Sequence, residues 1–243
     1  MATNIAVFNP RLSERKLLLA TAIGFPLVVL VGYARTYYFS AFFDVPAVAN
    51  RLVHTHGVIM SAWVLYFVMQ TVFIRTRNIK LHMTMGMIGV ALAALVIVVG
   101  LLTAYDAQLV RHAAPPGADP HAFFLLPVSD MVIFAALFSA AIYYRKKATE
   151  HKCLMFLTAI AFMPAALFRL PVAPPQYAEL WAFGVPGLIA LGALAWHWYK
   201  TGKLNRPFAI GTALIVVMIP LRPVVAHSNA WLSFVAWLVP SAG

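Results

Sequence analysis

Apolar runs long enough to cross a lipid bilayer recur along the whole chain, and no other feature restricts the fold as strongly. About 20 helical residues span the roughly 30 Å hydrocarbon layer. Seven runs approach or exceed this length, at roughly 17–34, 57–74, 83–105, 122–144, 152–170, 179–199 and 207–226. The sequence therefore predicts an all-α, polytopic helical bundle in which residues 1–243 form a single transmembrane domain.

The composition agrees with a chain that is solvated mainly by lipid. Hydrophobic residues make up 63% of the sequence and charged residues only 10%, whereas soluble domains carry about 25% charged residues. In a membrane protein, a net charge of +11 reports topology and contact with anionic lipid, so we expect no nucleic-acid partner. The only cysteine, Cys153, excludes an internal disulfide and a thiolate metal cluster.

The basic residues predict the orientation of the bundle. If the spans alternate in direction, 13 of the 18 Lys and Arg residues lie on one side. The exceptions are Arg35, Arg51, Arg111, Arg169 and Arg222. By the positive-inside rule, residues 1–16 form a cytoplasmic segment and the C-terminus lies outside, as in a multi-pass protein of a bacterial inner membrane.

Three charged residues fall within or beside the apolar runs. Asp130 lies about two helical turns inside the outer border, and Arg169 and Arg222 reach a similar depth from other spans. Buried charges are costly and usually face a partner or a cavity. A structural ion pair between Asp130 and one arginine is one interpretation. The other is a site where an arginine holds a propionate, a quinone oxygen or a carboxylate.

The histidines alternate between the two borders. His54, His56, His112, His121 and His227 are predicted to be outer, and His82, His151 and His197 inner. Taken one per helix, the order His56, His82, His121, His151 is the order that two stacked bis-histidine haems would need. Helices two and four would hold an outer haem, and helices three and five an inner one. The region 54–170 is therefore the expected histidine-bearing core.

Two other interpretations of these histidines stay open. Side chains at span ends can simply face the headgroups, as interfacial aromatic residues do. Alternatively, an outer group of histidines with Asp106 or Asp119 would suit Zn, Cu or Fe. The members of this alternative metal site are His54, His112 and His227, with His56 and His121 nearby in the predicted topology.

Two resemblances rest on these residues. The His56-Gly57 start, the basic turn 75–80 and Leu81-His82 with Gly86, followed by His151-Lys152, resemble a broad group of uncharacterised bacterial multi-pass membrane proteins, which implies a bundle but no activity. The alternating histidines resemble those of the diheme cytochrome b family of transmembrane ascorbate-dependent ferric reductases. That likeness implies electron transfer, although the family has six spans rather than seven.

The sequence thus leads to one main functional hypothesis and two alternatives. The main one is a membrane oxidoreductase component that binds haem b and exchanges electrons with quinone or a metal. Axial ligands would be His56, His82, His121 and His151, with Arg169 and Arg222 near propionates or quinone and Asp130 fixing the arginines. The alternatives are a cofactor-free accessory or assembly subunit of a larger membrane complex, and an outer-face metal-dependent enzyme or transporter.

Overall fold

The computed structural model describes residues 10–172 and 174–239, so residues 1–9 of the predicted cytoplasmic segment 1–16 lie outside it. The described chain is helical and contains no strand. Its α-helices are α1 (Pro10–Tyr33), α2 (Arg51–Arg75), α3 (Ile79–Tyr105), α4 (Pro120–Phe123), α5 (Leu125–Tyr143), α6 (Ala148–Leu167), α7 (Ala178–Thr201), α8 (Arg206–Ala226) and α9 (Asn229–Leu238). Short π or 3-10 turns occupy Ala34–Tyr38, Ser40–Phe42, Asp106–Val110 and Pro175–Tyr177.

The seven predicted spans are confirmed by length and composition. Seven helices of the described chain are long and apolar enough to cross a membrane. Counted with their terminal turns, they are Lys16–Tyr38, Arg51–Arg75, Ile79–Val110, Pro120–Tyr143, Ala148–Leu167, Ala178–Thr201 and Arg206–Ala226. The protein is therefore an all-α polytopic membrane bundle.

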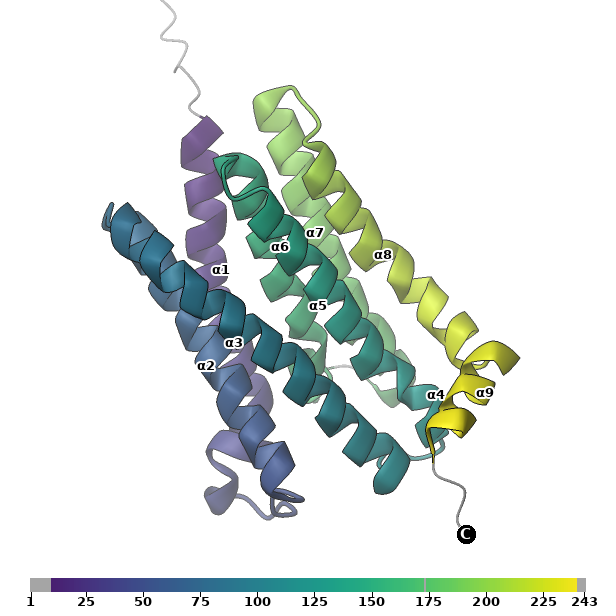
Figure 1. Ribbon diagram of the computed structural model, residues 1–243. Coiled ribbons are helices and arrows are strands. Elements are labelled where there is room, and N and C mark those ends of the chain that lie inside the picture. Colours follow the sequence, from purple (N-terminus) through teal and green to yellow (C-terminus); the bar gives the residue numbers. More distant parts are fainter. Residues whose placement is uncertain (1–9, 173, 240–243) are drawn as a thin grey trace, which may run out of the picture.

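The helices run alternately up and down, so that the basic turns gather at one end. The start of α1 and the turns α2–α3, α5–α6 and α7–α8 lie together at the top of Figure 1. We call this the basic end. The segments 39–50, 106–119, 168–172 and 174–177 lie at the opposite end with α9, and we call this the far end.

Asparagine side chains fix the starts of three long helices. Asn50 accepts from the Val53 amide at the start of α2, Asn78 from Leu81 at the start of α3, and Asn205 from Phe208 at the start of α8. The first amides of a helix lack intrahelical partners, and Asn is among the residues that best supply one. The first two caps set where α2, which carries His54 and His56, and α3, which carries His82, begin.

Helix α6 forms the centre of the bundle. It packs against α1, α5, α7 and α8, and most of its residues from Cys153 to Leu167 are buried. Close approach of α1 depends on Gly32, where an added Cβ would overlap the backbone of Ala166. Small residues at such crossings let helix backbones approach closely in lipid.

The α2–α3 hairpin is attached to this centre through an aromatic cluster. Trp63 on α2 is only 1% exposed, and its ring centroid lies 5.1 Å from that of Phe134 and 5.6 Å from that of Phe138, both on α5. Phe134 in turn lies 4.4 Å from Phe162 of α6. Helix α3 also packs against α5, so α5 lies between the hairpin and α6.

Several element boundaries differ from the prediction. Helix α2 begins at Arg51 rather than near residue 57, because Asn50 caps it there; His54 and His56 therefore lie inside the helix. The third span continues through the π turn Asp106–Val110, which buries Gln108 and Leu109. Helix α9 was not expected. Ser228 caps it, and its Trp231 packs against the far end of the bundle.

Candidate functional site

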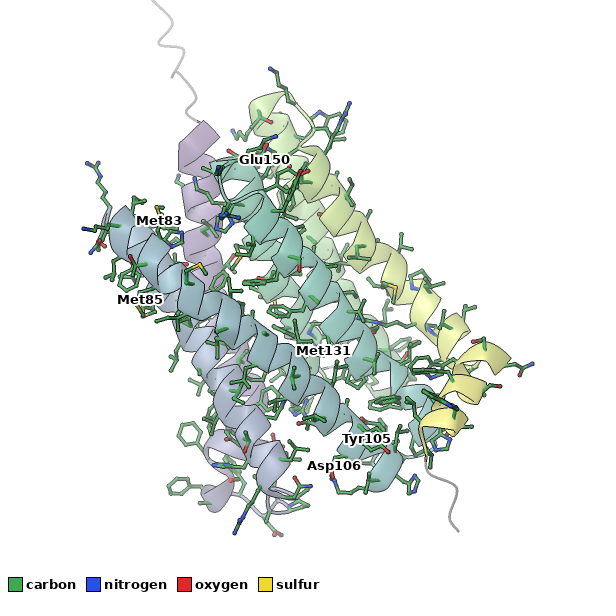
Figure 2. All side chains as sticks on the ribbon, viewed as in Figure 1. Met83, Met85, Tyr105, Asp106, Met131 and Glu150 are labelled. Atoms are coloured by element: carbon green, nitrogen blue, oxygen red, sulfur yellow. The ribbon has the colours of Figure 1, made fainter. Side chains whose placement is uncertain are left out.

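Two histidines from different helices meet at the basic end of the bundle. His82 lies in the first turn of α3 and His151 in the first turn of α6. Their ring centroids are 6.3 Å apart, with 65° between the ring planes. Met83, next to His82, and Glu150, next to His151, mark this end in Figure 2. The structure thus brings together the two histidines expected at the inner border.

The tautomer of His82 is set by a chain of hydrogen bonds within the hairpin. The Tyr66 hydroxyl donates to the carbonyl of Met85, which can only accept. The Tyr66 oxygen therefore accepts from Nε2 of Gln70, at 2.7 Å, which fixes the orientation of that amide. Oε1 of Gln70 then lies 2.5 Å from Nδ1 of His82. Because an amide oxygen only accepts, the proton of His82 is on Nδ1.

A glycine makes room for this chain. A Cβ at Gly89 of α3 would lie 2.6 Å from Cε1 of Tyr66 and 2.9 Å from its hydroxyl oxygen. Carbon atoms in contact are normally separated by about 3.5–4.0 Å. The missing side chain at Gly89 is therefore what allows the Tyr66 ring to lie against α3 and reach Met85.

His151 is held in the same tautomer by a different partner. Its Nδ1 lies 2.8 Å from the carbonyl oxygen of Ala141, near the end of α5. A backbone carbonyl only accepts, so Nδ1 of His151 carries the proton. Helix α5 thereby orients the His151 ring from one side of the pair, while α2 orients His82 from the other.

These hydrogen bonds determine which nitrogen of His82 and of His151 can act as a ligand. With both Nδ1 atoms protonated, the Nε2 atom of each neutral ring presents a lone pair. Each of these lone pairs can accept a hydrogen bond or bind a metal ion. Metal-binding histidines commonly donate their other ring N–H to a carbonyl in this way, which fixes the ring and makes the ligand nitrogen more basic.

The predicted outer pair is not assembled. The His121 ring lies 6.2 Å from that of His112, not beside His56. His56 lies in the second turn of α2, where its Nδ1 is buried and has no hydrogen-bond partner. The pairing of helices two and four failed because His121 sits in the short helix α4 at the far-end surface. There its carbonyl accepts from Trp231 Nε1 of α9, at 3.0 Å.

Asp130 and Arg222 form an ion pair between α5 and α8. Nη2 of Arg222 lies 2.5 Å from Oδ1 of Asp130, and the two side chains are 6% and 14% exposed, respectively. Nε of Arg222 donates to the Ser129 hydroxyl at 2.8 Å, and the guanidinium carbon lies 4.2 Å from the centroid of the Phe183 ring. Arg222 is thereby engaged on three sides, as in the structural-pair interpretation.

Arg169 takes no part in that pair. Its guanidinium carbon lies 4.2 Å from the centroid of the Tyr33 ring, and Nη1 donates to the Ala165 carbonyl of its own helix segment. Arg169 follows the end of α6 and Arg222 lies near the end of α8, both toward the far end, whereas His82 and His151 lie at the basic end. The two arginines are thus not placed beside the His82–His151 pair.

The residues of the alternative outer metal site are also dispersed. Nδ1 of His54 lies 3.2 Å from the Tyr37 hydroxyl, and His227 Nδ1 donates to the Pro223 carbonyl at 2.9 Å. The ring of His112 instead neighbours that of His121. Among the described residues, no three His, Cys, Asp or Glu side chains gather as a metal site.

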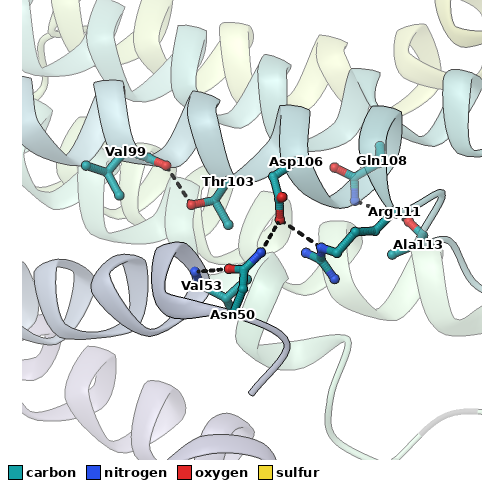
Figure 3. Close-up of polar contacts among 8 residues, drawn as sticks. All are labelled: Asn50, Val53, Val99, Thr103, Asp106, Gln108, Arg111 and Ala113. Atoms are coloured by element: carbon teal, nitrogen blue, oxygen red, sulfur yellow. Dashed lines mark hydrogen bonds and ion pairs between the residues drawn. The ribbon is translucent and has the colours of Figure 1, made fainter. Parts of the chain in front are cut away.

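The two aspartates suggested as further outer ligands already have partners. Oδ2 of Asp106 accepts from Asn50 at 2.9 Å and from Nε of Arg111 at 2.8 Å (Figure 3). Oδ1 of Asp119 accepts from the His121 amide at 3.0 Å and so caps α4. Asp106 therefore ties the loop after α3 to the start of α2.

Three residues that build these sites were not predicted from the sequence. Gln70 and Tyr66 orient His82, and Ser129 is the second partner of Arg222. A signal for the first two was present, since Tyr66 and Gln70 are polar, lie four residues apart in an apolar run and therefore share one helix face. Ser129 precedes Asp130, but adjacency alone does not indicate that both side chains reach Arg222.

Comparison with known proteins adds no assignment. The chain matches no protein-family model, and no curated protein or solved structure is detectably similar to it. The His82–His151 pair and its hydrogen bonds are therefore the features on which a function has to be based.

Proposed function

We propose that the protein is a membrane electron-transfer protein that binds one haem b at its basic end, with His82 and His151 as the axial ligands. The observation that carries this proposal is that both rings hold their proton on Nδ1, through Gln70 and Ala141. The ligand nitrogens left over are two neutral Nε2 atoms, and a neutral imidazole is a usual axial ligand of haem iron.

The spacing of the rings fits this role. Two imidazoles bound to one metal from opposite sides, each through a bond of about 2.0 Å, have ring centroids about 6 Å apart. The centroids of His82 and His151 are 6.3 Å apart. In addition, the two ligands come from different helical pairs, the α2–α3 hairpin and α5–α6, as is common for cofactor sites inside bundles.

The charges around the pair also suit haem b, whose two propionates are anionic. Arg77 lies in the turn before α3 and Lys80 in the first turn of α3, while Lys146 and Lys147 lie in the turn before α6. These residues are exposed at the basic end. They replace Arg169 and Arg222 as the proposed propionate partners.

When bound, the haem would supply one-electron oxidation and reduction. The protein's part is to bind and orient. Gln70 and Ala141 hold the two rings in a single tautomer. We place the basic end in the cytoplasm of a bacterium, in agreement with the positive-inside rule.

The test is an absorption spectrum of the full-length protein purified from haem-replete cells. We expect a Soret band, sharpening and shifting on reduction, and about one haem per chain by pyridine haemochrome assay. His82→Ala and His151→Ala should each remove the low-spin spectrum. A colourless wild-type protein that also binds no added haemin would overturn the proposal.

A matched control comes from the third histidine at the basic end. His197 on α7 is 8% exposed and packs against Phe208 rather than against the pair. His197→Gln should keep the haem and its spectrum. Loss of haem in this variant to the same extent as in His82→Ala would show that the pair is not the binding site.

A further inference from the structure

The second histidine pair lies at the far end of the bundle, in a part of the structure that the proposed haem does not use. His112 follows the π turn at the end of α3, and His121 is the second residue of α4. Their ring centroids are 6.2 Å apart, with 53° between the ring planes. His112 is exposed and His121 is half-buried, so water and dissolved ions reach the pair.

The backbone holds His112 in a conformation that non-glycine residues seldom adopt. Its φ angle is +50°, which lies in the left-handed region. Two hydrogen bonds keep it there. The Ala113 amide donates to the Ala107 carbonyl at 2.8 Å, and Nε2 of the buried Gln108 donates to the Ala113 carbonyl at 3.3 Å. Such conformations persist where the surrounding structure imposes them, and they cluster at functional sites.

His121 is held from the other side of the loop. Asp119 caps α4 by accepting from the His121 amide, and the His121 carbonyl accepts from Trp231 Nε1 of α9. Trp231 also packs against Phe124, with ring centroids 5.9 Å apart. The two rings are thus brought together by two separately anchored backbone segments.

The charges beside the pair favour a cation. Arg111, the nearest cationic residue in sequence, is bonded to the Asp106 carboxylate at 2.8 Å (Figure 3), which offsets its charge. The carboxylate of Asp119 lies two residues before His121.

We infer that His112 and His121 form an outward-facing site for a single divalent transition-metal ion, Cu²⁺ or Zn²⁺, held by two imidazoles. Imidazole suits these ions, and Cu²⁺ binds nitrogen sites most tightly among the first-row divalent metals. Two protein ligands leave the other coordination positions to water or to a ligand from solution. The site is independent of the haem pair, which lies at the other end of the bundle.

The test is titration with Cu²⁺ alone of the full-length protein in nanodiscs, purified with a tag that contains no histidine. We expect one tight equivalent and an electron paramagnetic resonance spectrum of a type 2 copper with nitrogen splitting. His112→Gly, which accommodates the positive φ, and His121→Ala should each weaken this equivalent at least about tenfold, because each removes one of two ligands.

Matched controls are the other exposed far-end histidines. His54→Ala and His227→Ala remove imidazoles that lie beside Tyr37 and Pro223 instead, and both variants should retain the equivalent. An unchanged titration in both His112→Gly and His121→Ala would overturn the inference, as would loss of the equivalent in the two controls. Haem content should be the same in all four variants, which separates this test from that of the proposed function.

Discussion

Oε1 of Gln70 on α2 accepts a hydrogen bond from Nδ1 of His82 on α3, at 2.5 Å. The contact spans the hairpin near its basic turn and links the imidazole to Tyr66 and through it to the Met85 carbonyl. Gln70 is a polar, half-buried side chain within an apolar span. Its amide oxygen fixes the proton of His82 on Nδ1 and leaves Nε2 unprotonated in the neutral ring.

The first prediction concerns this bond. Gln70→Leu keeps the bulk of the side chain but removes the acceptor, so Nδ1 of His82 loses the partner that fixes its tautomer. Loss of such a supporting hydrogen bond lowers the affinity of a metal site by about 10- to 100-fold. We expect a loss of this order in haem affinity, measured by titration of haem-free protein with haemin, together with a changed reduction potential.

Tyr66→Phe should have a smaller effect in the same direction, because it removes the group that orients the Gln70 amide. Gln176 lies exposed in the 3-10 turn at the far end, and Gln176→Leu serves as the control. Equal haem affinity in wild type, Gln70→Leu and Gln176→Leu would show that Gln70 does not support the site.

The second prediction compares two glycines one turn apart on α3. Gly89→Ala places a methyl group 2.6 Å from the Tyr66 ring, which is held by Met85 and Gln70. Overpacking of this kind costs about 1–3 kcal/mol. At Gly86 an added Cβ would meet nothing within 4 Å, so Gly86→Ala should be neutral or stabilising by up to about 1 kcal/mol.

Thermal unfolding in detergent would measure the difference between the two alanine variants. A lower melting temperature for Gly89→Ala than for Gly86→Ala is the expected order. The reverse order would mean that Tyr66 does not lie against α3 as described.

The spans and the basic-end pair were within reach of sequence reasoning. Apolar length decides what crosses a bilayer, so the seven spans could be counted from residues alone. Strict alternation of those spans then puts His82 and His151 at one end. Charged side chains at similar depth in lipid need partners, so an ion pair at Asp130 could be predicted. The sequence did not indicate that Arg222, and not Arg169, would be the partner.

The positions of the outer histidines could not be predicted, because they depend on helix starts and on contacts of short helices. His56 and His121 were expected to meet. However, Asn50 caps α2 so that the helix begins at Arg51, six residues before the predicted start at Gly57, and Trp231 of the unexpected helix α9 donates to the His121 carbonyl at the far-end surface. Neither the cap nor the tertiary contact alters the hydrophobic pattern. The approach of the His112 and His121 rings likewise involves a residue with a positive φ angle, which a hydrophobic pattern does not indicate.

The third prediction concerns orientation. In a Cys153→Ala background, Lys146→Cys places a thiol on the exposed turn at the basic end, and Ala118→Cys places one on the exposed far-end loop. If the basic end is cytoplasmic, a membrane-impermeant maleimide added to bacterial spheroplasts should label Ala118→Cys at once. It should label Lys146→Cys only after the membrane is permeabilised. The opposite pattern would reverse the proposed topology.

The last prediction contrasts two Asp–Arg pairs in the same protein. Asp130→Ala leaves the guanidinium of Arg222, which is 6% exposed, without its counter-charge inside the bundle. Breaking a buried pair by removing one partner typically costs about 3–5 kcal/mol. The Asp130→Leu, Arg222→Leu double variant removes both charges, so its free energy of unfolding should recover much of that loss.

Asp106 and Arg111 supply the comparison, because their side chains are 21% and 31% exposed. Asp106→Ala should cost only about 0–1 kcal/mol from the lost charge pairing, although the bond to Asn50 is lost as well. Free energies of unfolding from denaturant titration in mixed micelles would rank the variants. If the double variant is no more stable than Asp130→Ala, the cost lies in packing around Asp130 and not in the unpaired charge of Arg222.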